Sequence, residues 1–482
     1  MAKKLLAILA ALCLMAAMGS VGASAVPGYD LENDRPALYA IDSIDPKEPA
    51  AGNGEFHILV LPDTHQTADA DPNLIAYIES AIKYAEVTGH PVDLIIFLGD
   101  MVSGSGCASA ATITTAVQAL LGPIKAAQIP FTVLFGNHDL GDTHGAVTGA
   151  EVLQIWKDEG GTMDIEYEVQ VPVPGTDPIE YTTETQTETM PLFVDPDENV
   201  PGSDATTGVT NFKYTVYQKL YRDMNWDDGR TTYGARSYKS LSNRYVDNTL
   251  IGARPIQLFL FDVGSKDAGQ EGYDYVRADQ LAWFTANNVT DQPAFVFQHI
   301  ALPEVYGSGY FLKSPFNWKL PGTINVLETN YFGTANFINM VGTVLEAPCP
   351  PNYSDGEFEA ITEGGNVQAA FFGHDHVNNY VERFKEQKID LVQLPGAAWN
   401  GSYGTYLVRG GSFVVIRPDE TGTGGVSYDS SFFTYRQAAR VPGSQVKSTI
   451  NGFKDWIMVI PFLLQNFIMF CFAPVRWIMG GF

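Results

Sequence analysis

The chain has 482 residues with a formal net charge of −26 at neutral pH, and 45% of its residues are apolar. That apolar content is enough to build one large core with insertions. The strong negative charge excludes nucleic acid as a structural partner and anionic lipid as a general one, because both interactions draw on clustered basic residues.

The first 25 residues predict export. Two lysines precede an apolar run that begins at Leu5, and Ala23-Ser-Ala25 stands directly before Val26. This is the pattern of a secretory signal peptide with an Ala-x-Ala cleavage site. We therefore expect the mature protein to be secreted, at the cell surface or membrane-associated.

Cys107, Cys349 and Cys471 remain after this leader. An exported protein can form disulfides, but pairing cannot be read from the sequence. A bridge between Cys107 and Cys349 and two free thiols are both compatible with the sequence.

The first third of the mature chain alternates buried strands with helices. Apolar runs end at Leu61, Leu98 and Phe135, and helices are predicted over residues 71–89 and 111–127. In the first helix Asp71 is the expected N-cap, Pro72 opens the first turn and Gly89 ends it. A βαβαβ order predicts three parallel strands whose carboxyl ends meet at one edge.

Polar side chains follow each of these strands. Asp63 and His65 come after the first, Gly99-Asp100 after the second, and Gly136-Asn-His-Asp139 after the third. Ligands collect at the carboxyl ends of strands in α/β sheets. The parallel topology therefore brings Asp63, Asp100 and Asn137 together.

Residues from about 160 to 254 form an inserted excursion rich in turn residues, Thr and Glu. We expect part of it to be a hairpin, with the chain rejoining the core near residues 211–217 and 256–262. The excursion is either a lid over the substrate or a solvated insertion, and the pattern favours the insertion.

Two later strands also end in histidines. A helix over residues 277–287 leads to a strand that ends at His299, and a second strand ends at Gly373, before His374 and His376. The ligand types at these strand ends are Asp, Asn and His. This set suits Zn, Mn or Fe and is too rich in histidine for a calcium cage.

Short alternating strands are predicted after His376, over residues 390–394, 405–408, 412–416 and 432–436. They fit the second sheet of the sandwich that the family resemblance given below implies.

The carboxyl-terminal part is nearly continuous apolar sequence over residues 456–475. It is long enough to span a bilayer of about 30 Å. Pro461, Gln465 and Asn466 interrupt it, so an interfacial helix and a helix packed on the domain remain alternatives. We assign residues 441–482 as a hydrophobic membrane-associating segment.

The ordered motifs Asp-x-His, Gly-Asp, Gly-Asn-His-Asp, His and Gly-His-x-His resemble those of the calcineurin-like metallophosphoesterase family. They span residues 63–376, and the stretches 298–304 and 373–379 further resemble the secreted subgroup related to purple acid phosphatases. For residues 26–440 the resemblance implies an α/β fold, a four-layer α/β/β/α sandwich of two mixed sheets with metals at the strand carboxyl ends.

The resemblance also implies two divalent metal ions, Mn, Zn or Fe. The first would be held by Asp63, His65 and His376, and the second by Asn137, His299 and His374, with Asp100 bridging the two. In purple acid phosphatases a tyrosine that binds ferric iron stands three residues after the bridging aspartate. Ser103 occupies that place here, which favours two divalent ions.

Further roles follow from the same resemblance. His138 would be an acid that is not a metal ligand, Asp139 an orienting carboxylate, and Asn137 and His138 would contact the substrate. A hydroxide held between the metals would attack phosphorus, and His138 would protonate the leaving alkoxide.

We therefore expect an exported phosphatase for phosphate monoesters, whose substrate is a phosphorylated small molecule or a phosphoprotein. A phosphodiesterase acting on nucleotides, lipids or wall polymers is the first alternative. A surface binding module on a phosphatase scaffold is an alternative of another class.

Overall fold

The structure is a computed structural model of the whole chain. It describes residues 56–103, 106–139, 147–172, 181–194, 198–201, 210–214, 256–263, 272–306, 340–346, 348–384, 386–400, 404–418, 426–449, 455–457, 459–460 and 462–463. The expected signal peptide, Cys471 and most of the apolar tail lie outside these residues.

The first sheet has five strands in the order β15-β14-β1-β2-β3. Their bounds are β1 (Phe56–Leu61), β2 (Leu94–Leu98), β3 (Phe131–Leu134), β14 (Gly410–Pro418) and β15 (Val426–Thr434). The strands β1, β2 and β3 are parallel, as the βαβαβ order predicted, whereas β14 and β15 run antiparallel to their neighbours. The three parallel strands therefore end at a common edge.

The second sheet has eight strands in the order β10-β12-β13-β11-β9-β8-β7-β6. Their bounds are β6 (Glu198–Pro201), β7 (Thr210–Tyr214), β8 (Gln257–Phe261), β9 (Ala294–Gln298), β10 (Met340–Thr343), β11 (Val367–Phe372), β12 (Asn379–Phe384) and β13 (Ile389–Gln393). Its four central strands, β8, β9, β11 and β13, are parallel.

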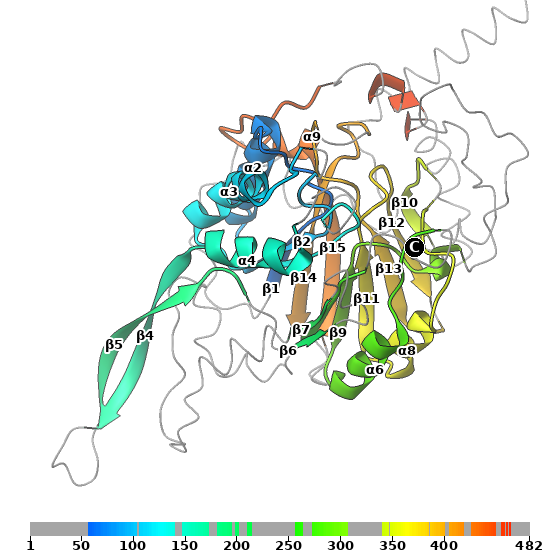
Figure 1. Cartoon of the computed structure of the whole chain (residues 1–482). Coiled ribbons are helices and arrows are strands. Elements are labelled where there is room, and N and C mark those ends of the chain that lie inside the picture. The colour runs from blue at the N-terminus through cyan, green and yellow to red at the C-terminus, as the bar shows by residue number, and fades with distance from the viewer. Residues whose placement is uncertain are drawn as a thin grey trace, which may run out of the picture.

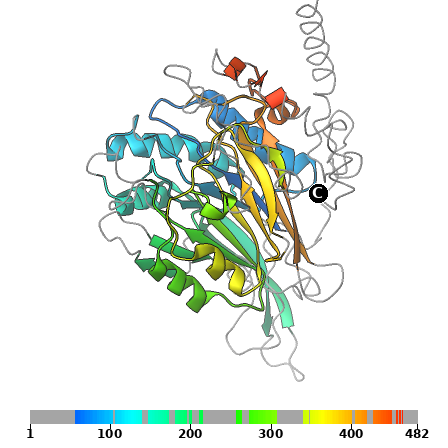
Figure 2. The ribbon, with the colours of Figure 1, turned by 90° about the vertical axis from the view of Figure 1, so that its right-hand side faces the viewer.

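Helices cover the outer faces of both sheets (Figures 1 and 2). The first sheet carries α2 (Pro72–Val87), α3 (Ala110–Ala127), α4 (Gly149–Glu159) and the short α9 (Tyr435–Ala438). The second carries α6 (Ala278–Asn287) and α8 (Glu357–Glu363), and the 3₁₀ turn η2 (Pro303–Tyr306) follows β9. The predicted cap of α2 is confirmed, because the Asp71 carboxylate accepts from the amides of Asn73 and Leu74.

Alternation along the strands of the second sheet separates two layers of core. Phe295 and Phe297 of β9 pack toward the first sheet, whereas Val296 between them packs among residues that include Phe284 of α6. Successive side chains of a strand point to opposite faces, so one strand serves both layers. The result is the predicted four-layer α/β/β/α sandwich.

The predictions for the last strands were wrong in two respects. Residues 405–408 form a turn, in which the Val408 amide donates to the Thr405 carbonyl. The strands β14 and β15 join the first sheet, where Phe413 lies opposite Leu59 of β1, and only β13 joins the second. Alternation identifies a strand but not the edge on which it pairs.

The excursion begins as a long hairpin of β4 (Thr162–Pro172) and β5 (Tyr181–Pro191) that extends away from the sheets (Figure 1). The chain then returns to the first sheet, where Phe193 bridges Phe131, the first residue of β3. The strands β7 and β8 confirm the predicted return to the core. The hairpin therefore leaves from the amino end of β3, opposite the edge where the predicted ligands stand.

The packing of the domain continues beyond residue 440. Val441 is buried, and the Lys447 amide donates to the Asn73 side chain on α2. Further along, Asp455 is 1% exposed, and Phe462 packs in a cluster with Val377. In the part of the chain that the structure describes, no helix combines the length and the apolar character needed to cross a membrane.

No disulfide joins Cys107 and Cys349, so the alternative of a bridge between them is not realised. Cys107 is buried and Cys349 is exposed. Cys107 lies at the start of α3 on the first sheet, whereas the backbone of Cys349 bonds to Asp375 beyond β11 of the second.

Candidate metal centre

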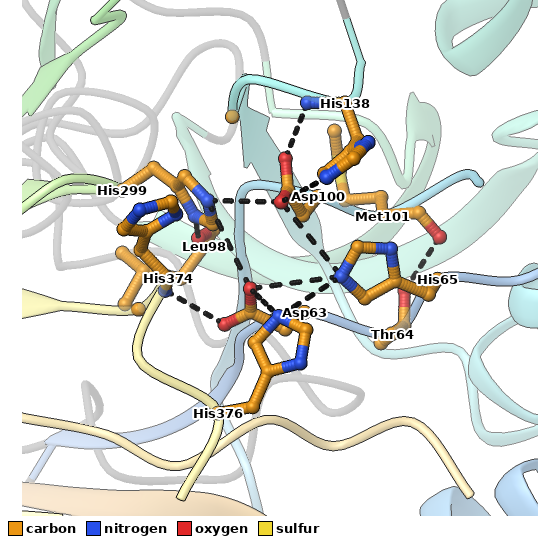
Figure 3. A network of polar contacts seen from close by, with 12 residues as sticks. Asp63, Thr64, His65, Leu98, Asp100, Met101, His138, His299, His374 and His376 are labelled. Atoms are coloured by element: carbon orange, nitrogen blue, oxygen red, sulfur yellow. Dashed lines mark hydrogen bonds and ion pairs between the residues drawn. The ribbon is translucent and has the colours of Figure 1, made fainter. Parts of the chain in front are cut away.

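The loops that follow β1, β2, β3, β9 and β11 converge where the two sheets meet (Figure 3). Two groups of side chains there could each hold a metal ion. The first group is Asp63, His65, Asp100 and His376, and the second is Asp100, His299 and His374. Each group combines residues from both sheets, and Asp100 belongs to both. The site therefore depends on the packing of the two sheets against each other.

In the first group, one carboxylate oxygen of Asp63 and the Nε2 atoms of two histidines lie close together. The Nε2 atoms of His65 and His376 lie 3.2 Å apart, and Nε2 of His376 lies 3.2 Å from Oδ1 of Asp63. The other carboxylate oxygen of Asp63 accepts a hydrogen bond from the His374 amide at 2.9 Å. Oδ1 of Asp63 thus faces the site, and Oδ2 bonds to the backbone of the loop after β11.

Asp100 stands between the two groups. Its Oδ2 lies 3.2 Å from Nε2 of His299 and 3.7 Å from Nε2 of His65. Its Oδ1 accepts from the His138 amide at 2.7 Å. A carboxylate within reach of histidines from both groups has the geometry required of a bridging ligand.

The backbone at the site is strained. Asp63, His65, Asp100 and His374 all have positive φ angles, of 48°, 41°, 49° and 73°. Side chains other than glycine rarely adopt this region, and each such residue costs about 1–3 kcal/mol. This strain turns the side chains back toward a common centre directly after their strands.

The glycines of the motifs provide room for this convergence. A Cβ at Gly99 would lie 2.5 Å from the His299 ring, one at Gly136 would lie 2.3 Å from Oδ1 of Asp100, and one at Gly373 would lie 2.8 Å from Oδ2 of Asp63. Any other residue at these positions would displace a candidate ligand. The glycines therefore belong to the site as much as the ligands do.

Several ligand atoms are buried without a hydrogen bond among the described residues. They are Oδ1 of Asp63, Oδ2 of Asp100, Oδ1 of Asn137 and Nε2 of His299. Three of these atoms are in ion-pair contact with one another, because Nε2 of His299 lies 3.2 Å from Oδ2 of Asp100 and 3.8 Å from Oδ1 of Asp63. A buried polar atom without a hydrogen bond costs about 1–3 kcal/mol, so several at one place call for a bound group. Carboxylate, amide and imidazole donors fit two divalent transition-metal ions.

The protonation states also suit metal binding. Burial lowers the pKa of His65 to about 4 and that of His374 to about 3, which keeps both imidazoles neutral. Burial would raise the pKa of Asp100, but His299 and His65 outweigh it and hold the pKa well below its usual range. Metals bind neutral imidazole and ionised carboxylate.

His299 is positioned by the neighbouring strand. Its Nδ1 faces the Leu98 carbonyl at 2.9 Å, which directs Nε2 at the site. Burial would lower the pKa of His299, but Asp100 and Asp63 raise it to about 10. The negative charge of these carboxylates, which stabilises a proton on His299, would also stabilise a metal cation at the same place.

His138 lies beside the site without belonging to either group. Its side chain is 42% exposed, and its Nε2 lies 4.0 Å from Oδ2 of Asp100. The ring also meets the edge of His65, with centroids 5.2 Å apart. An imidazole that is close to the centre and open to solvent can exchange a proton with a bound molecule.

The carboxylate of Asp139, predicted to orient His138, bonds to three backbone amides. Its Oδ1 accepts from the amides of Met101 and Val102, and its Oδ2 accepts from the Gly136 amide. Burial and the nearby Asp100 raise the pKa of Asp139 to about 8. Asp139 therefore ties the β2 and β3 loops together through their backbones.

The sequence reading missed Asp262, which links the two sheets beneath the site. Its Oδ1 accepts from the Phe135 amide at 2.7 Å, and its carbonyl accepts from the Gln280 side chain. Asp262 follows the buried strand β8 directly. A carboxylate directly after a buried apolar run was therefore the signal that could have identified it.

Residues 56–185 match the calcineurin-like phosphoesterase family. The chain is 22% identical over 354 residues to "Probable inactive purple acid phosphatase 28" of Arabidopsis thaliana, covering 69% of this chain and 68% of that protein. It is 24% identical over 360 residues to "Probable inactive purple acid phosphatase 29" of the same plant, covering 69% and 70%. A dimetal phosphatase from Danio rerio aligns over 79% of this chain and 99% of its own at 9% identity, with a TM-score of 0.38.

The sandwich and the two ligand groups that share Asp100 define a metallophosphoesterase scaffold. Over residues 56–185 the chain resembles the calcineurin-like phosphoesterase family. Within that family it resembles the proteins related to purple acid phosphatases.

Proposed function

We propose that this chain is a dinuclear metal-dependent hydrolase of phosphate monoesters. The observation that carries the proposal is the pair of ligand groups joined by Asp100, with ligand oxygens that have no hydrogen bond among the described residues. A phosphorylated small molecule or a phosphoprotein would be the substrate.

The ligands would divide as the groups do. Asp63, His65 and His376 would hold one divalent ion, His299 and His374 the other, and Asp100 would contact both. Asn137, whose buried Oδ1 has no hydrogen bond among the described residues, would complete the second set. Mn, Zn or Fe would suit these donors. When bound, the ions would lower the pKa of a water and neutralise charge on the phosphoryl oxygens.

His138 is the residue best placed to move a proton. It lies beside Asp100, outside both ligand groups, and a large part of its side chain is open to solvent. It would donate a proton to the oxygen of the departing alcohol, and together with Asn137 it would contact the phosphoryl group. The backbone bond from His138 to Asp100 holds the ring near the reacting atoms.

The names of both Arabidopsis relatives include the word inactive. A non-catalytic binding module on this scaffold is therefore the competing function. The chain keeps a ligand at each strand end and an exposed His138 beside them. A binding module has no need of this full set, which favours catalysis.

One assay tests the proposed function. The protein is stripped of metal, reloaded with Mn, Zn or Fe(II) separately, and offered an aryl phosphate and the matching bis-aryl diester. We expect the metal-loaded protein to hydrolyse the monoester faster than the diester, and the stripped protein to hydrolyse neither. Preference for the diester would favour a phosphodiesterase, and no turnover with any ion would favour the binding module.

The cellular location is part of the proposal. The leader of residues 1–25 supports export, and the apolar segment from Trp456 onward supports membrane association. The contacts of Asp455 and Phe462 with the domain indicate that any such attachment begins close to its surface. Fractionation of cells that express the full chain, compared with a chain ending at Ile460, tests whether this segment holds the protein on membranes.

A further inference from the structure

Tyr273 lies against the second ligand group, although it is far from every motif in the sequence. Its ring meets the ring of His374 edge to face, with centroids 4.3 Å apart and an interplanar angle of 78°. His374 in turn meets His299 at 5.3 Å. Tyr273 is therefore in direct contact with the part of the site that would hold the second metal.

The exposure of the site residues shows which side is open. The side chains of Asp63, Asp100 and His299 are fully buried, whereas His138 and His374 are partly exposed. His138 adjoins the first group, and Tyr273, itself half-buried, adjoins the second. One partly exposed side chain therefore lies beside each ligand group.

The backbone around Tyr273 is held firmly. Gly272 has a φ of +134°, and a Cβ there would lie 2.7 Å from Nδ2 of Asn352, so the segment fits closely against the chain near residue 352. The neighbouring Asp274 is buried and accepts from the Tyr275 amide and from Arg277 at 2.6 Å. A side chain on such a support loses little further freedom when it binds a ligand.

The surroundings of the Tyr273 phenol are acidic. Asp375, Asp100 and Glu346 all act on it electrostatically. Among the described residues this hydroxyl makes no hydrogen bond. Its oxygen does not belong to the set of fully buried polar atoms that lack one. It is a neutral donor available to a bound molecule beside a cluster of acceptors.

We propose that Tyr273 contacts the substrate, and that its hydroxyl donates a hydrogen bond to a phosphoryl oxygen of the ester bound at the second ligand group. The inference rests on the proposed function and extends it by naming a recognition residue. His138 contacts His65 of the first ligand group, whereas Tyr273 contacts His374 of the second. The proposed hydrogen bond would therefore come from the residue that lies next to the second group.

The test uses the full chain loaded with metal, the variant Tyr273→Phe, and Tyr275→Phe as a matched control two residues along the same segment. Binding of inorganic phosphate is measured by calorimetry, because it requires no turnover. A hydrogen bond to a charged group contributes about 1.5 kcal/mol, so Tyr273→Phe should weaken phosphate binding about tenfold. KM for the aryl phosphate should rise by a similar factor, while metal content and the control stay at wild-type values.

Three results would overturn the inference: unchanged phosphate affinity in Tyr273→Phe, loss of metal in that variant, or no phosphate binding by the metal-loaded wild type. Loss of metal would mean that Tyr273 only supports His374. A wild type that binds phosphate through Tyr273 but hydrolyses no ester would support the inference while contradicting the proposed function. The two failures are therefore distinguishable.

Discussion

The two ends of strand β3 differ in kind. Its carboxyl end lies at the edge where the ligands converge. Several polar atoms there are buried without hydrogen bonds, and residues of the neighbouring loops have left-handed backbone conformations. Its amino end pairs with Phe193, where the β4–β5 hairpin returns to the sheet, and that hairpin extends away from the core. The same strand thus connects the strained ligand edge at one end with the hairpin, which contributes no ligand, at the other.

This difference indicates where the fold gives up stability. Each left-handed ligand residue costs about 1–3 kcal/mol, and each buried polar atom without a partner adds a similar amount. The surrounding sheets offset these costs, and bound metal would offset more by binding only the folded chain. Changes at the ligand edge should therefore act on function, and changes in the hairpin should leave function unaltered.

The largest effect is expected from Asp100→Asn. The substitution keeps the size of the side chain but removes the charge that both ligand groups share. Loss of several kcal/mol of charge stabilisation corresponds to a rate loss of at least about 10³-fold. Kinetics with an aryl phosphate and elemental analysis check this outcome, since metal content should fall together with the rate. Full metal content and near-normal activity would remove Asp100 from its bridging role.

His138→Asn should lower the rate by about 10²- to 10⁴-fold toward esters with poor leaving groups. Metal content should stay near that of the wild type, because His138 lies outside both ligand groups. A series of aryl phosphates with different leaving groups measures the effect. If metal disappears with activity, His138 is a structural residue and the acid must be sought elsewhere.

Two glycines provide a matched pair. In Gly136→Ala the new Cβ would lie 2.3 Å from Oδ1 of Asp100, whereas a Cβ at Gly122 on α3 would meet nothing within 4 Å. Gly136→Ala should cost about 1–3 kcal/mol of stability and at least a tenfold loss of activity. Gly122→Ala should stabilise the fold by about 0.5–1 kcal/mol with unchanged activity. Thermal unfolding and initial rates would compare them, and equal activity in both variants would contradict a tightly packed ligand edge.

The smallest effect should come from the hairpin. Replacing residues 165–188 with a short turn keeps Leu192 and Val194, whose backbones bond to Phe131. We expect kcat/KM for the aryl phosphate to stay within about twofold of the wild type, because this end of β3 lies opposite the ligands. A strong loss of activity would show that the hairpin reaches the site after all.

Much of the ligand edge could be predicted because its signals are local. Apolar runs followed by glycine and a polar residue identify the strand ends, and the βαβαβ order brings Asp63, Asp100 and Asn137 together. The strands β14 and β15 were assigned to the wrong sheet, because β14 joins the first sheet by pairing with β1, about 350 residues away in the sequence, and β15 pairs with β14. Contacts of that kind leave no periodic trace in the sequence.

Asp139 and Tyr273 could not be assigned for a related reason. The position of Asp139 beside His138 suggested an orienting role, whereas the bonds from its oxygens to the amides of Gly136 and Met101 were not indicated by the sequence. Tyr273 lies in a loop without a motif and reaches His374 only through the packing of the second sheet. The direction in which a loop side chain points depends on the folded conformation of the loop, so the sequence alone does not indicate it.

The central claim is that this site holds two metal ions joined by Asp100. Its most direct test is the metal stoichiometry of the active, metal-replete protein, determined by elemental analysis after excess ions are removed. Two divalent transition-metal ions per chain is the predicted result, with an Asp100→Asn sample retaining fewer. Active protein that contains only trace transition metal would contradict the account.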